Sequence, residues 1–288
     1  MSYKPPVENP GSKLFVYLYK PTTAFSFPIE MLAQFIQDTL KDKLVNNEVE
    51  IREEFLQNYV VSEEDLTPRK HAAEIMARCR IEDIKVEQLP YDKDEKVQIF
   101  YTAMELNLLE GIPPDRCRDY LYHGPRLMEN FRNFIPESER TLEHLHIIFT
   151  DRLFCSWNFS DARYHARAIF LGFPHLISMP GLVEAPARPR EYYIKRHLYA
   201  SSGLPVDELE AEFAGQYLIY KDARTVEALK GYILQSLFYT LFKDPFCTDP
   251  DCRLFNSHWQ SELLRSQLES GKLCKNHSEI IKQYVDGK

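Results

Sequence analysis

Clusters of apolar residues divide the first part of the chain into alternating strands and helices. Residues 13–19 are dominated by aromatic and aliphatic side chains, which predicts a strand, and residues 28–44 carry apolar positions at helical spacing. A short strand near residues 49–52 and a helix over residues 66–84 follow, with Pro68 close to the start of that helix. A chain that alternates strand and helix builds a layered α/β fold.

The pattern is less regular in the middle of the chain. Residues 142–150 form an apolar run that we place as a strand at the centre of the sheet. The other expected elements are helical segments at residues 97–109 and 115–134 around a Gly-Pro turn at 111–114, strands at 168–173 and 175–179, and a Pro-rich connection at 180–189. Residues 222–242 are apolar on nearly every side, which predicts a helix buried inside the fold.

The strongest chemical signal lies near the C-terminus. Cys247, Cys252, Cys274 and His277 follow the order C-x4-C-x21-C-x2-H within 31 residues. Three thiols and one imidazole are the ligands that a closed tetrahedral zinc site uses. Because four protein ligands leave no open position for water or substrate, the predicted role of this one zinc ion is structural.

A helix between the two halves of this motif makes the site geometrically possible. Residues 257–268 carry apolar positions at helical spacing, with Ser257 and Gln260 in capping-box positions and Gly271 just past the end. The run over residues 253–256, if extended, leads away from Cys252 over most of the length of this helix. The helix can therefore bring Cys274 back toward Cys252. His258 is an alternative fourth ligand, although His277 has the tight C-x2-H spacing. Three alternatives to a zinc site stay open: free thiols, another metal, and a Cys247–Cys252 disulfide. The disulfide is the least favoured if the protein is cytosolic, because cytosolic thiols stay reduced.

Composition narrows the class of protein. The 288 residues are 44% hydrophobic and 27% charged, as in ordinary globular proteins. With 35 basic and 43 acidic residues, the chain lacks the basic excess of a nucleic-acid binder. It shows neither an apolar signal segment nor a run long enough to span a membrane, so we expect a cytoplasmic protein without nucleic-acid or membrane partners. Cys79, Cys117 and Cys155 stand singly and are interpreted as buried small hydrophobic residues.

The order of a long apolar helix, then Phe246-Cys247-x4-Cys252-Arg253-Leu254, then a C-terminal cysteine with a ligand three residues later, resembles the archaemetzincin family of zinc metallopeptidases. The chain is also similar to an uncharacterised archaeal family described as metallopeptidases. The resemblance implies a zincin-like or metzincin-like mixed sheet with packed helices (α/β or α+β), and a C-terminal loop and helix stapled by zinc. The implied division is a lead-in over residues 1–12, a zincin-like domain over 13–245 and a zinc-binding segment over 246–288.

The chain departs from that family at the catalytic motif. Archaemetzincins carry HExxHxxGxxH on the long helix, and a gapless count back from Cys247 puts the three His positions on Ser236, Thr240 and Phe246 and the Glu position on Leu237. No HExxH occurs anywhere in the chain. Two positions of the tail also differ, because Leu254 stands where the family has Met and His277 where it has Cys. The expectation is therefore a zinc-binding relative without catalytic residues.

Two hypotheses on function follow. The first is a pseudoenzyme whose former cleft, beside the helix at residues 222–242, is filled by side chains or binds a peptide or protein. The alternative is an active hydrolase or peptidase with a relocated metal site. Candidate ligands for that site are His144 and His146, which alternate on the predicted strand, with His165, His175, His197, Asp151 and Asp161. The substrate or ligand and the oligomeric state stay open.

Overall fold

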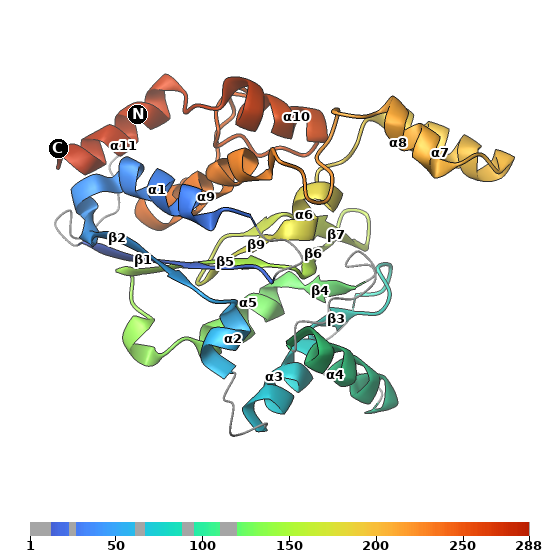
Figure 1. Ribbon diagram of the computed structural model, residues 1–288, viewed down its shortest axis with the longest axis horizontal. Helices are drawn as coiled ribbons and strands as arrows, with labels where there is room; N and C mark the ends of the chain where they lie inside the picture. Colours follow the sequence, from blue (N-terminus) through green and yellow to red (C-terminus); the bar gives the residue numbers. More distant parts are fainter. Residues whose placement is uncertain (1–12, 23–26, 61–66, 88–94, 110–119, 288) are drawn as a thin grey trace.

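The computed structural model describes residues 13–22, 27–60, 67–87, 95–109 and 120–287. Its centre is a five-stranded sheet in the order β2-β1-β5-β9-β8 (Figure 1). The strands are β1 (Leu14–Tyr19), β2 (Leu44–Arg52), β5 (His144–Thr150), β8 (Ile169–Phe170) and β9 (His175–Ser178). The strands β2, β1, β5 and β9 run parallel, and β8 joins the edge antiparallel to β9. The expected mixed α/β fold is confirmed, with β5 in the central position.

Helices cover both faces of this sheet (Figure 1). One face packs against α1 (Ile29–Leu40) and α9 (Thr225–Phe242), and the other against α2 (Phe55–Val60) and α5 (Gly124–Phe134). Neighbouring residues of a strand point to opposite faces, so on β5 Ile147 joins the α9 side and Ile148 the α5 side. The helix expected at residues 222–242 is buried along most of its length, as predicted.

A second mixed sheet has the order β3-β4-β6-β7. Its strands are β3 (Arg80–Ile81), β4 (Leu121–His123), β6 (Leu153–Asn158) and β7 (Arg163–Arg167), and the helices α3 (Thr67–Arg78) and α4 (Glu95–Leu109) lie beside it.

The second sheet corrects two sequence predictions. The helix expected over 66–84 ends at Arg78, and in the segment expected to be helical over 115–134 residues 121–123 form β4. The two strands replace helix because Arg80 of β3 pairs with Tyr122 of β4, and both side chains bond to the buried Glu105 carboxylate of α4. The turn expected at 111–114 lies outside the described residues.

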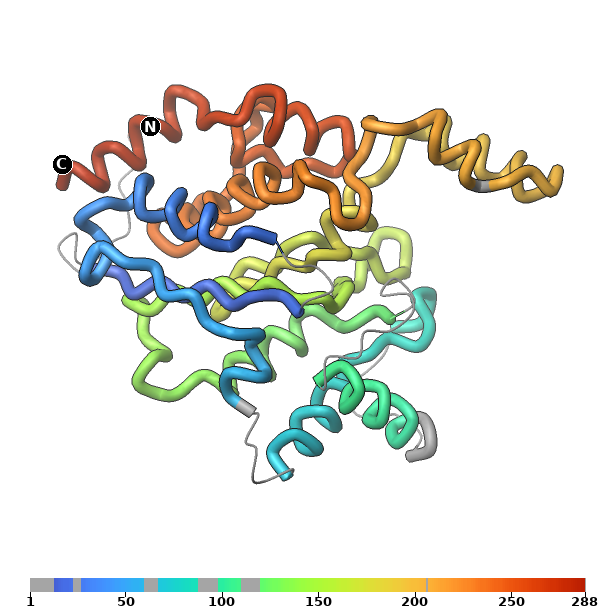
Figure 2. The backbone as a smooth tube through the Cα atoms, in the orientation of Figure 1, coloured from blue at the N-terminus to red at the C-terminus, as the bar shows by residue number. Residues whose placement is uncertain are grey.

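The chain after β9 is more helical than predicted. Where a Pro-rich connection is expected, α6 (Met179–Glu184) forms, because the Ser178 hydroxyl accepts the Gly181 N–H at 2.9 Å and caps the helix. Next, α7 (Arg190–Ser202) and α8 (Val206–Glu212) project from the body as an arm (Figure 2). None of the described helices has both the length and the apolar character to cross a bilayer.

The tail packs over α9 through α10 (Gln260–Leu264), a π-helical turn (Arg265–Ser270) and α11 (Lys275–Asp286). The predicted capping box at Ser257 is wrong. The helix begins at Gln260, and the Glu262 carboxylate accepts the backbone N–H groups of His258 and Trp259 at 2.7 and 3.0 Å. The Gln260 amide instead points inward, and it accepts the Leu218 N–H at 3.0 Å. Gly271 ends the helical segment at a φ of +61°, as expected.

Candidate metal centre

Short backbone pairings bring the four residues of the C-terminal motif together. The Cys247 N–H donates to the Leu254 carbonyl at 2.9 Å, and the Arg253 N–H donates to the Lys272 carbonyl at 2.9 Å. Cys252 therefore lies between the segments that carry Cys247 and Cys274. Cys274 is the N-cap residue of α11, which puts His277 in the first turn of that helix.

The ligand atoms form a compact group. Cys247 Sγ lies 3.9 Å from Cys274 Sγ, Cys252 Sγ lies 3.8 Å from His277 Nδ1, and Cys274 Sγ lies 3.1 Å from the same nitrogen. All four atoms lie within 4.8 Å of one another. Ligands about 2.3 Å from a tetrahedral zinc ion are separated by about 3.8 Å, so the spacing fits such an ion.

Burial acts in opposite directions on the pKa of the thiols and of the imidazole in this group. Burial raises the pKa of Cys252 to about 12 and also raises the pKa of Cys247, so the free thiols resist ionisation. Burial lowers the pKa of His277, which keeps its imidazole neutral and able to coordinate. Three sulfurs and a neutral imidazole at this spacing form the donor set of a structural zinc site, in which the metal charge would stabilise the thiolates.

Backbone N–H groups also point at the sulfurs. The Cys274 N–H donates to Cys252 Sγ at 3.3 Å, and the Asp249 N–H donates to Cys247 Sγ at 3.4 Å. Such bonds fix ligand orientation from outside the coordination sphere. The His277 ring packs edge-on against Phe238 of α9 at a centroid distance of 5.4 Å, so the group is anchored to the body of the fold.

His258, the alternative ligand, is exposed and is not part of this group. The candidates for a relocated metal site lie apart from one another. His146 is buried on the α5 side of the sheet, where its Nδ1 lies 2.8 Å from the Tyr19 hydroxyl. His175 pairs in register with Ile147 on the α9 side, and its Nε2 lies 2.8 Å from the Thr240 hydroxyl.

The remaining candidates are no closer to a common centre. His144 lies on the same face of β5 as His146 and packs against Phe15, and His165 of β7 lies 2.7 Å from Asp161 of the preceding turn. Asp151 bonds to Thr22, and His197 is exposed on α7. Across the part of the chain that the structure describes, the Cys247 group alone gathers three or more such ligands. Cys79 and Cys155 are buried, as expected, and Cys117 lies outside the described residues.

The positions where the catalytic motif is expected are occupied by packed side chains. Ser236 is buried, and its hydroxyl donates to the Tyr232 carbonyl at 3.0 Å. Leu237 is fully buried, and Thr240 is bonded to His175. The described part of α9 thus offers no imidazole or carboxylate at these positions.

A cavity of about 340 Å³ lies beside α9. Tyr232 and Gln235 of the helix form one wall, Ala168 and Ile169 form another, and residues 255–258 of the tail close it. The sequence predicts the α9 wall of this cavity. It does not predict the other two walls, because their segments lie far apart in the chain and meet only after folding.

One protein family and one solved structure are similar to this chain. A family described as a probable metallopeptidase family (DUF6775) matches residues 12–284. Among solved structures, archaemetzincin from Methanopyrus kandleri is similar over 97% of this chain and 99% of that chain, with 12% sequence identity and a TM-score of 0.40. No curated protein matches the chain.

Proposed function

The chain belongs to the probable metallopeptidase family, as its resemblance predicts, and from that premise we propose that it is a member without peptidase chemistry. One structural zinc ion holds the C-terminal segment, and the cleft beside α9 binds a peptide or a protein. A catalytic zinc needs three protein ligands, an open position and a base for the metal-bound water.

The observation that carries the proposal is the state of α9. Ser236, Leu237 and Thr240 occupy the expected motif positions, and all three are committed to internal packing or hydrogen bonds. A metal ion there would have no ligands from the helix. This supports loss of the reaction with retention of the scaffold.

The Cys247 group supports the zinc-binding half of the proposal. Zinc in small structural sites contributes on the order of 10–16 kcal/mol of apparent binding energy, which acts as folding energy. The tail between Cys247 and His277 contains only short helical segments, with α10 five residues long. An ion held at this point would connect α11 to the segment that leaves α9.

The cavity beside α9 supports the binding half. Its volume falls at the lower end of the range for ligand sites, and Tyr232, Phe246 and Phe255 give it aromatic walls. The lining also includes Ile169 of β8, an edge strand of the central sheet. Sheet edges accept extended peptides through main-chain hydrogen bonds, so the favoured occupant is an extended segment with an aromatic or aliphatic side chain.

Metal analysis tests the zinc-binding half and the absence of catalysis. We expect one zinc ion per chain, none after Cys274→Ala, and one after the double change of His144→Ala and His146→Ala. The Cys155→Ala variant is the matched cysteine control and should keep its zinc. The purified protein should leave a mixture of unstructured peptides intact, whereas two zinc ions per chain or zinc-dependent cleavage would contradict the proposal.

Peptide binding is tested separately by screening a library of extended peptides by fluorescence anisotropy. Asn256 is exposed at the cavity, so Asn256→Trp should block entry without disturbing the core. Gln216→Trp places the same side chain at an exposed position away from the cavity and serves as control. Selected peptides should lose about tenfold or more in affinity only with Asn256→Trp; equal binding to both variants would exclude this cavity.

A further inference from the structure

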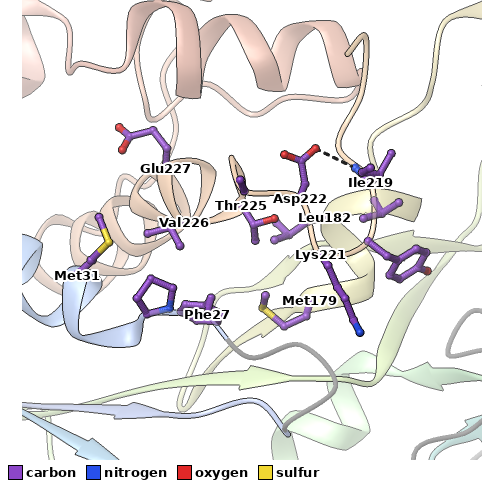
Figure 3. A pocket seen from close by; sticks show the side chains of 14 residues that line it. Phe27, Met31, Met179, Leu182, Ile219, Lys221, Asp222, Thr225, Val226 and Glu227 are labelled. Carbon is purple, nitrogen blue, oxygen red and sulfur yellow. Dashed lines mark hydrogen bonds between the residues drawn. The ribbon is translucent and has the colours of Figure 1, made fainter. Parts of the chain in front are cut away.

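A larger cavity, of about 550 Å³, lies at the N-terminal end of α9 (Figure 3). Phe27 and Met31 at the start of α1 form one wall, and Met179 and Leu182 of α6 form another. The third wall is residues 219–227, the turn that leads into α9 and its first turn. This cavity shares no lining residue with the one proposed to bind a peptide.

The acidic residues of the lining are already neutralised. Asp222 accepts two hydrogen bonds from the Arg224 guanidinium, at 3.0 and 2.8 Å. Glu227 accepts from Lys230 at 2.7 Å and forms an ion pair with Arg253. Neither carboxylate is therefore available to repel an anion in the cavity.

Lys221 is the cationic residue of the lining (Figure 3). Within the described residues its ammonium group has no hydrogen bond or ion pair. Its φ of +62° lies in the left-handed region, which is unfavourable for a side chain other than glycine. The turn holds it there, because the Asp222 N–H donates to the Ile219 carbonyl at 3.2 Å and the Thr225 N–H donates to the Asp222 carbonyl at 3.1 Å.

We propose that this cavity binds a small amphipathic carboxylate. Its apolar part lies against Phe27, Met179 and Leu182, and its carboxylate pairs with Lys221. The volume lies within the range of small-molecule sites, and such sites combine apolar walls with a few polar groups that set orientation. Residues 225–227, the first turn of α9, also line the cavity, and the partial positive charge of a helix N-terminus favours a carboxylate.

The test uses decanoate as probe, with decanol as its uncharged match, and measures both by isothermal titration calorimetry on the full chain. Wild-type protein should bind decanoate more tightly than decanol. Lys221→Met keeps a side chain of similar length and removes the charge. It should lower the affinity for decanoate by about tenfold and leave the affinity for decanol unchanged. Lys243→Met is the matched control, because Lys243 is also exposed with a φ of +58° but lies outside the cavity.

A second variant keeps the proposal testable if Lys221→Met disturbs the turn. Met31 lines the cavity and is 52% exposed on α1, so Met31→Glu adds a negative charge there without a buried substitution. This variant should lower the affinity for decanoate and leave the affinity for decanol unchanged. Equal affinities for decanoate and decanol in wild type, or no saturable binding of decanoate up to about 1 mM, would overturn the proposal.

The source of the carboxylate is distinguished in the same assay. An apolar tripeptide with a free C-terminal carboxylate is compared with its C-terminal amide and with decanoate. Tighter binding of the tripeptide acid than of both others identifies the end of a peptide chain as the ligand. Tighter binding of decanoate identifies a free aliphatic acid.

Discussion

Glu105 is a buried carboxylate held between two arginines. Its Oε1 accepts from Arg80 at 2.8 Å and from the Tyr122 hydroxyl at 2.6 Å, and its Oε2 accepts from Arg152 at 2.9 Å. The arginines hold the pKa of Glu105 below its usual value although burial alone would raise it. One carboxylate thus bonds to two buried guanidinium groups, Arg80 of β3 and Arg152 of the connection between β5 and β6.

Replacing Glu105 with Gln should destabilise the protein by about 3 kcal/mol, because the change removes the buried charge that bonds to both Arg80 and Arg152, and the Glu54 carboxylate, 4.0 Å from Arg152, replaces it only in part. Urea unfolding followed by circular dichroism measures the loss. Glu137→Gln, at an exposed position, is the control, and its free energy of unfolding should differ from that of wild type by less than about 0.5 kcal/mol. A similar result for Glu105→Gln would show that the ion pairs contribute little.

The buried carboxyl group of Asp151 should make the stability of the protein depend on pH. Burial raises its pKa to about 7, with a further contribution from the nearby Glu54 carboxylate and an opposing one from Arg152. An unfolded aspartate titrates near pH ~3.9, so between these values the folded state holds a proton that the unfolded state has lost. The contribution of Asp151 to the free energy of unfolding therefore falls as pH rises from about 4 to about 7, and the loss persists above that.

Asp151→Asn removes this titration while keeping an acceptor for the Thr22 hydroxyl. We expect the free energy of unfolding of the variant to equal that of wild type at about pH 4 and to exceed it by about 1–3 kcal/mol at about pH 8. Urea titrations at several pH values measure this difference. Asp161→Asn, on the β6–β7 hairpin, should keep the wild-type slope, and a parallel slope in Asp151→Asn would refute the assignment.

At the scale of elements, α5 and β8 meet through a glycine. A Cβ added at Gly124, the first residue of α5, would collide with the ring of Phe170 on β8. That ring also packs edge-on against Phe154 at a centroid distance of 5.1 Å, so it has little room to move. Gly124 therefore sets how closely the helix approaches the sheet edge.

Gly124→Ala should cost about 1–3 kcal/mol of stability, despite the higher helix propensity of alanine, because it overpacks this contact. In a Phe170→Ala background the same change should cost less than about 0.5 kcal/mol, since the ring is gone. A double-mutant cycle by urea unfolding measures the coupling. Additive costs would mean that the glycine serves another purpose.

Elements with long apolar runs were predictable from the sequence. The strand at 142–150 and the helix at 222–242 were found within three residues at each end, because burial on both sides leaves a continuous signal. The strands β3 and β4 were missed. They are two and three residues long, and Arg80 and Tyr122 are held by Glu105 from another element, which no local pattern reveals.

The candidate metal site was more predictable than the segments around it. Spacing and ligand type identified four side chains that the structure gathers, because ligand chemistry does not depend on which local elements carry them. The start of the intervening helix was missed, because Gln260 bonds inward to Leu218 and Leu182, far along the chain. The same limit applies to both cavities, whose walls come from distant segments.

At the scale of the whole molecule, the arm of α7 and α8 has a small core of its own. Tyr192 is 2% exposed and packs with Leu209, Phe213 and Tyr217, apart from the two cores that flank the central sheet. Its hydroxyl also lies 2.6 Å from a Glu210 carboxylate oxygen. A separate core of four buried residues predicts that the arm opens independently of the body.

Tyr192→Ala should therefore unfold the arm while the body stays intact, because losing a buried aromatic ring costs about 3–5 kcal/mol in a core and this small cluster has little to spare. Hydrogen exchange with mass spectrometry should show rapid exchange over residues 190–212 and unchanged protection in β5 and β9. Leu198→Ala is the matched control, since Leu198 lies on the same helix but is 56% exposed. Loss of protection in β5 and β9 with Tyr192→Ala would instead mean that arm and body fold as one cooperative unit, because the arm would then share in the global free energy of unfolding.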